Sequence, residues 1–98
     1  MHISITYKDS YNGIPYTAAS VETPFTDMKM ALQDAFGKTQ NAFASWSEKP
    51  QSGVTVCHYK FDGSPLRSSM VGDEFIVWTS EKDFKKFEVA KIGFKEIV

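Results

Sequence analysis

The 98 residues include eleven basic and twelve acidic side chains, which give a formal net charge of −1. This balance argues against a dedicated duplex-DNA binder and equally against an acidic DNA mimic. The length suits a single domain spanning 1–98 with one modest core. Because aromatic residues make up 14% of the chain, we expect rings in the core and further rings on the surface.

The expected cellular setting is the cytoplasm. Cys57 is the single cysteine, so an internal disulfide cannot form, and a reducing compartment is the default for such a chain. The first residues lack the basic and apolar regions of a signal peptide, and no apolar run approaches the ~18 residues of a membrane span. We therefore expect a soluble protein without a membrane partner.

Two strands joined by a hairpin turn are predicted first. Residues 2–8 alternate between apolar and polar side chains, which is typical of a half-buried strand. Asn12-Gly13 suits a type I′ turn, so 14–22 should return as the second strand, with Tyr7 opposite Ala18. The buried face of the second strand would then carry Ile14, Tyr16 and Ala18.

A long helix is predicted from Thr23 to Trp46. Thr23 is the expected N-cap and Pro24 the first helical residue, where the missing N–H of proline costs nothing. Gly37 leaves two alternatives: one continuous helix, or a break into 24–36 and 38–47. One long helix is favoured because the apolar residues keep a single helical phase: Phe25, Met28, Leu32, Ala35, Phe36, Phe43 and Trp46.

Two central strands are predicted in the second half of the chain. After a polar connection at 47–53, residues 54–61 carry apolar side chains on both faces, and residues 73–79 do the same. A strand that is apolar on both faces is typical of the middle of a sheet. Between these strands 62–65 reads as a turn, and 66–72 is either a short strand or part of a loop.

The C-terminal part predicts a short helix and a final strand. Ser80-Glu81-Lys82-Asp83 has the form of a capping box, after which Phe84 and Phe87 would share a helical face. Residues 89–98 suit a strand. The order β-β-α-β-(β)-β-α-β predicts an α+β domain with one long helix and one short helix packed on a mainly antiparallel sheet of four to six strands.

We find no motif for catalysis, so the chain is predicted not to be an enzyme; a small enzyme without a recognisable motif ranks third among our hypotheses. Cys57 and His58 would point to opposite faces of a strand, so Cys57 is expected to be a buried structural thiol. Asp73 and Glu74 also diverge, as at a solvated loop edge. Together with His2 these residues match no metal-binding spacing, and we expect neither a metal nor another cofactor.

The leading functional hypothesis is a small protein–protein interaction module. It would act by binding, as an inhibitor or adaptor of the kind found among accessory proteins of phages and other mobile elements, and a homodimer is an open alternative. Arginine and methionine are enriched at interfaces, and loops on a rigid sheet often carry recognition. The predicted partner-binding residues are therefore Arg67 and Met70 within 62–73, and Tyr11 in the first turn.

The alternative is a module that binds single-stranded nucleic acid. Five lysines lie close together near the C-terminus, with Phe84 and Phe87 between them, and such a segment can bind a strand by charge and stacking. The same pattern is also typical of the solvated face of a short amphipathic helix, so nucleic acid is the less favoured partner. The lysines are Lys82, Lys85, Lys86, Lys91 and Lys95.

Overall fold

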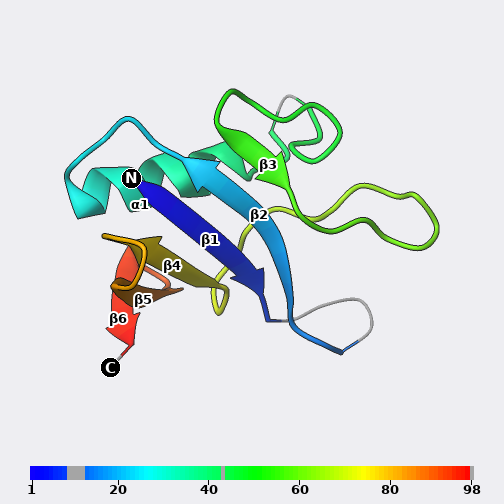
Figure 1. Ribbon diagram of the computed structural model, residues 1–98. Helices are drawn as coiled ribbons and strands as arrows, with labels where there is room; N and C mark the ends of the chain where they lie inside the picture. The colour runs from blue at the N-terminus through cyan, green and yellow to red at the C-terminus, as the bar shows by residue number, and fades with distance from the viewer. Residues whose placement is uncertain (9–12, 43, 98) are drawn as a thin grey trace.

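The computed structural model describes residues 1–8, 13–42 and 44–97. These residues form an α+β fold in which a helix lies behind a six-stranded antiparallel sheet (Figure 1). The sheet order is β3-β2-β1-β4-β5-β6. The elements are β1 (His2–Tyr7), β2 (Tyr16–Glu22), α1 (Met28–Lys38), β3 (Val54–Val56), β4 (Glu74–Trp78), β5 (Phe84–Val89) and β6 (Phe94–Ile97). The predicted fold class is confirmed, but the described residues contain one helix and not two.

The first two strands pair as predicted, but in a different register. Tyr7 lies opposite Tyr16, whereas Ala18 was expected there. The difference arises from a bulge, because Ile5 pairs with Ala19 and the next residue of β1 pairs with Thr17, which leaves Ala18 as an extra residue. Ala18 is buried as predicted, Tyr16 is half-buried, and Ile14 precedes β2 and is exposed, contrary to the prediction. Asn12 of the predicted turn lies outside the described residues.

The helix is shorter than predicted at both ends. It begins after Asp27, whose carboxylate accepts a hydrogen bond from the Met30 N–H at 3.0 Å, so Thr23 is not the N-cap and Pro24 is not helical. It ends at Lys38, where the Thr39 hydroxyl donates to the Ala35 carbonyl at 2.9 Å. Gly37 therefore lies in the last turn of α1. Neither predicted alternative holds, because Gly37 does not separate two helices and no long helix continues beyond it.

Trp46 lies in the segment between α1 and β3, whose described residues, 39–42 and 44–53, form neither helix nor strand, and not in the predicted long helix. Its ring is nevertheless buried against Tyr7, with the ring centroids 6.3 Å apart. Its backbone N–H donates to the Asn41 side chain and its indole N–H to the Arg67 carbonyl. The apolar spacing thus identified a core residue correctly but assigned it to the wrong element.

In the second half, β4 is central as predicted, because it lies between β1 and β5. The prediction of a central strand over 54–61 is wrong in both the length of the strand and its position in the sheet. β3 covers only 54–56 and forms the edge of the sheet, since the chain leaves the sheet after Val56. Residues 66–72 contain no strand, so the loop alternative holds for them.

The predicted short helix is also wrong, because 84–89 is strand β5. Ser80 and Asp83 form one of the two bonds of a capping box: the Asp83 N–H donates to the Ser80 hydroxyl at 3.0 Å, but the Asp83 carboxylate accepts from that hydroxyl and not from the Ser80 N–H. These bonds close a turn between β4 and β5 and do not begin a helix. Phe84 and Phe87 consequently point to opposite faces of the sheet. The final strand is restricted to Phe94–Ile97.

The core lies between α1 and one face of the sheet. Ile3, Ile5 and Tyr7 of β1 are fully buried on this face, and Leu32 and Ala35 of the helix pack over it. The opposite face carries no helix or strand among the described residues, and it faces the viewer in Figure 1. We call it the open face; cross-strand pairing places on it His2, Ser4, Thr6, Thr17, Ser20, Glu22, Thr55, Glu74, Ile76, Trp78, Phe84, Lys86, Glu88, Lys95 and Ile97.

Candidate functional sites

The loop at 66–73 is held in place by a buried carboxylate. Asp73 is 1% exposed, and its two oxygens accept hydrogen bonds from the Arg67 guanidinium at 2.7 and 2.9 Å. They also accept from the backbone N–H groups of Met70 and Lys8. Asp73 is therefore not the solvated loop edge that the sequence suggested. Its hydrogen bonds to the guanidinium raise the pKa of Arg67, which keeps the guanidinium charged.

Tyr7 extends this network into the core. The Arg67 guanidinium lies 4.1 Å from the centre of the Tyr7 ring. Burial raises the pKa of the Tyr7 hydroxyl, which therefore stays protonated and donates to the Arg67 carbonyl at 3.0 Å. Ser69 bonds to both the Tyr7 hydroxyl and the Thr39 hydroxyl, and so ties the loop to the end of α1.

The predicted partner-binding residues thus occupy different environments. Arg67 points inward to Asp73, with 27% of its side chain exposed. Met70 and its neighbour Val71 are exposed, at 43% and 52%. Tyr11 lies outside the described residues. Arg67 and Met70 share one loop, but Met70 is the one that presents its side chain to solvent.

The five lysines of the nucleic-acid hypothesis do not lie on one face. Lys86 and Lys95 are on the open face. Lys86 precedes the acidic Glu88 by two residues on β5, and Lys95 lies directly opposite Glu88 on β6. Lys85 pairs with Val77 on the opposite face. Lys82 and Lys91 lie in the turns at the two ends of β5. The hypothesis stays a prediction.

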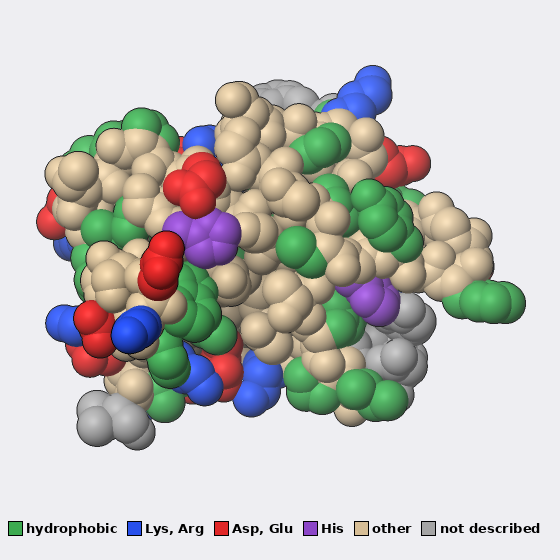
Figure 2. Space-filling model, viewed as in Figure 1, with side chains coloured by type: hydrophobic (Ala, Val, Ile, Leu, Met, Phe, Trp, Pro, Cys, Tyr) green, Lys and Arg blue, Asp and Glu red, His purple; other side chains and the backbone are tan. Residues whose placement is uncertain are grey.

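A projecting segment at 57–65, which we call the arm, carries the most exposed aromatic side chains of the described residues. It extends away from the body of the molecule at the right of Figure 1, and hydrophobic side chains lie at the outer end of this region in Figure 2. Exposed and half-buried residues alternate along its first five positions. Tyr59 is 77% exposed and Phe61 is fully exposed.

The tip of the arm is a hydrogen-bonded turn. The Gly63 N–H donates to the Lys60 carbonyl at 3.0 Å, and Gly63 has a φ of +76°, a conformation that favours glycine. The Asp62 carboxylate accepts hydrogen bonds from the Ser64 hydroxyl at 2.6 Å and from its N–H at 2.9 Å. These bonds lower the pKa of Asp62. Phe61 is therefore presented by a turn with a defined shape.

Both ends of the arm are attached to the body. At the start, the His58 ring stacks on Tyr16, with centroids 4.0 Å apart. At the end, Leu66 is buried and its N–H donates to the Ser47 hydroxyl at 2.9 Å. Cys57 is exposed, so the prediction of a buried structural thiol is wrong. The reason is that β3 ends at Val56, and none of the residues that the structure describes covers the next side chain.

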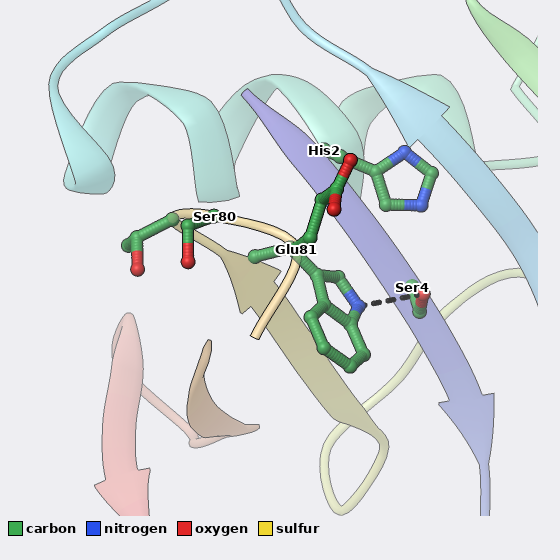
Figure 3. Close-up of a pocket in the computed structure, with 6 residues that line it drawn as sticks. His2, Ser4, Ser80 and Glu81 are labelled. Atoms are coloured by element: carbon green, nitrogen blue, oxygen red, sulfur yellow. Dashed lines mark hydrogen bonds between the residues drawn. The ribbon is translucent and has the colours of Figure 1, made fainter. Parts of the chain in front are cut away.

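The open face brings together a serine, a histidine and a glutamate. The Ser20 hydroxyl lies 3.1 Å from Nε2 of His2, and Nδ1 of the same ring lies 2.5 Å from the Glu22 carboxylate. Next to them the Trp78 indole N–H donates to the Ser4 hydroxyl at 3.2 Å (Figure 3). A shallow hollow beside this cluster is lined by His2, Ser4, Trp78, Thr79, Ser80 and Glu81.

The cluster is not predicted from the sequence, because the three residues meet only across the β1–β2 pair. His2 lies directly opposite Glu22, and Ser4 lies opposite Ser20. The predicted register placed Tyr7 opposite Ala18, which would have put His2 opposite Thr23. The signal in the sequence that could have located the cluster is the pair of adjacent small residues Ala18 and Ala19. Both are buried, and the bulge lies at this pair.

Within the described ranges, no group of three or more histidine, cysteine, aspartate or glutamate side chains is placed to hold a metal ion. The helix of the described part of the chain is too short and too polar to cross a membrane. Comparisons of the chain with protein-family models, with curated proteins and with solved structures found no match.

Proposed function

We propose that this chain is a protein-binding module that acts by inserting the aromatic side chains of its arm into an apolar cleft of a partner protein. The observation that supports the proposal is the full exposure of Phe61 at the tip of a hydrogen-bonded turn, with Tyr59 two residues before it. Burying one such ring from water is worth about 1.5–3 kcal/mol. Aromatic side chains also dominate the energy of many interfaces.

The shape of the arm favours a cleft as its target. A projecting turn is convex, so it fits a concave surface, and a turn already held by Gly63 and Asp62 loses little further freedom on binding. An arm that fills a cleft also blocks it, which supports an inhibitor more than an adaptor. A cytoplasmic setting is part of this proposal, as is a role among the accessory proteins of a phage or another mobile element.

The loop at 66–73 would form the rim of the interface. It follows the arm directly in the chain and exposes Met70 and Val71. Arg67 would contribute mainly by holding this rim on Asp73, and less by direct contact. A second copy of the chain is one form that the partner protein could take.

The test is to quantify binding with and without the two rings. The partner is first captured from nuclease-treated native extract and purified, and its affinity is then measured by calorimetry against wild type and Tyr59→Ala/Phe61→Ala. We expect at least tenfold weaker binding, which corresponds to about 1.4 kcal/mol. Ile92→Ala is the matched control, because Ile92 is an equally exposed apolar residue far along the chain, in the β5–β6 turn.

An unchanged affinity of the double variant, or an equal loss in Ile92→Ala, would contradict the proposal. The nucleic-acid alternative makes a different prediction. Binding of a single-stranded oligonucleotide would weaken steeply with salt and would depend on the lysines, while the arm variant would bind as wild type does.

A further inference from the structure

We propose that Ser20 is a nucleophile activated by His2, and that the open face thereby carries a slow ester-hydrolysing activity toward small uncharged or cationic esters. The activity is independent of partner binding by the arm. It rests on the order of two contacts: the serine hydroxyl meets one nitrogen of the imidazole, and a carboxylate meets the other. Nucleophile, base and orienting group are recognised by this geometry, whatever the fold.

The contacts select the tautomer that catalysis needs. Glu22 accepts a proton held on Nδ1 of His2, at an N–O distance of 2.5 Å. The lone pair of Nε2 is then directed at the Ser20 hydroxyl, 3.1 Å away, which is within the reach required of a general base. The carboxylate also stabilises the imidazolium that forms when the serine loses its proton.

The bulge at Ala18 is what creates this arrangement. Below the bulge, Tyr7 pairs with Tyr16, and the same register continued upward would place His2 opposite Val21. Since facing residues share a face, Ser20 and Glu22 would then point into the core. The extra residue shifts the register by one and turns both side chains to the side of His2.

Ser4 is placed to stabilise the oxyanion of the reaction. It is the cross-strand neighbour of Ser20, and its oxygen already accepts the Trp78 indole N–H. The Ser4 hydroxyl can donate its own hydrogen to another acceptor, and the developing oxyanion on a carbonyl attacked by Ser20 would be one. A single hydroxyl donor at a solvated face is weaker than a pair of backbone donors, so we expect a slow reaction.

The hollow beside the cluster indicates the class of substrate. The Trp78 ring lines this hollow and, with the Phe84 ring next to it at a centroid distance of 5.0 Å, offers an apolar surface for an acyl or leaving group. Glu81 lines the same hollow (Figure 3), and Glu22 lies next to His2. In Figure 2 acidic side chains adjoin a histidine on this face. Two carboxylates disfavour anionic esters, so uncharged or cationic esters fit best.

The reaction proceeds in two balanced halves. Ser20 Oγ forms a bond to the ester carbonyl carbon while its proton moves to Nε2 of His2. The bond to the leaving oxygen then breaks, and that oxygen takes the proton from His2, which releases an alcohol and leaves acyl-Ser20. Water attacks the acyl group and gives a proton to His2. Collapse releases the carboxylic acid, and the proton returns to Ser20.

The test uses the full chain with any tag at its C-terminus, because the N-terminal ammonium donates to the Thr23 carbonyl beside the site. The probes are p-nitrophenyl acetate for turnover and a fluorophosphonate for labelling. We expect one phosphonyl adduct, which peptide mass spectrometry locates on Ser20. Turnover should fall at least tenfold in Ser20→Ala and in His2→Gln, and Ser4→Ala should lower kcat with little change in KM.

His58→Gln is the matched control, since the chain has two histidines and an imidazole that reaches solvent hydrolyses this ester slowly by itself. Thermal unfolding of each variant verifies that the fold is retained. Turnover that is equal in wild type and Ser20→Ala, or that falls equally in His58→Gln, would overturn the proposal. So would a native protein that gains no adduct on Ser20. Tyr59→Ala/Phe61→Ala should keep wild-type turnover and labelling.

Discussion

At the scale of single residues, Asp73 is the side chain on which the loop at 66–73 depends. Arg67→Ala would leave this carboxylate buried without its cation, and breaking such a pair costs about 3–5 kcal/mol of unfolding free energy. Urea denaturation measures the loss. Arg67→Lys should recover only part of it, because an ammonium cannot bond to both oxygens as the guanidinium does.

The control for this prediction is Lys8→Ala, which removes an ion pair with Glu74 whose lysine is half-exposed. Exposed pairs contribute little, so this variant should change stability far less. Equal effects of Arg67→Ala and Lys8→Ala would mean that Asp73 does not hold the loop. The large expected loss also means that weaker partner binding by Arg67→Ala would not by itself identify Arg67 as a contact residue.

Asp62 gives a prediction for pH. Hydrogen bonds from Ser64 lower the pKa of this carboxyl below its usual 3.8 in the folded chain. Their contribution is therefore complete above the pKa of the unfolded chain and is lost as the pH falls through the lower folded value. An NMR titration should place the Asp62 midpoint below 3.8, and Ser64→Ala should move it back up. A midpoint that Ser64→Ala leaves unchanged would contradict this account of the turn.

At the scale of elements, α1 stabilises the sheet through a narrow apolar side. Leu32 is 3% exposed and packs in the core, whereas Met30, on the same helix, is 48% exposed. Leu32→Ala should cost about 2–5 kcal/mol of unfolding free energy, because it leaves a cavity. Met30→Ala should cost less than about 0.5 kcal/mol. Chemical denaturation compares the two, and similar losses would show that the assigned face of the helix is wrong.

At the scale of the whole molecule, the irregular segments and the sheet should unfold together. Trp46 lies in the segment 39–53 and packs on Tyr7, while Trp78 lies on the open face. Trp78→Phe leaves Trp46 as the single tryptophan, and Trp46→Phe leaves Trp78. If 1–98 is one cooperative domain, the fluorescence transition of each variant will coincide with its own far-UV circular dichroism transition. Separate transitions would indicate that 39–53 opens independently.

The sequence by itself determined which stretches are strands near the N-terminus and at β4, and it identified part of the buried core, including Ile3, Leu32 and Trp46. Alternation and apolar spacing are local properties, and they report how a segment divides its side chains between core and solvent. The α+β class follows from them. The arm residues Tyr59 and Phe61 escaped the prediction because 54–61 was assigned wholly to a central strand.

The tertiary structure alone decided where elements end and which side chains meet. The Ser80–Asp83 bonds suit a helix start or a hairpin turn, and pairing of 84–89 with β4 selects the turn. The bulge at Ala18 sets whether Ser20 and Glu22 face His2 or the core. Arg67 and Asp73 form their ion pair only when the loop between them is folded. The first two outcomes depend on strands that pair across the sheet, and the loop is held by contacts with Tyr7, Lys8 and Thr39, which are distant in the chain. A local pattern holds no information about which of the possible partners a segment will contact.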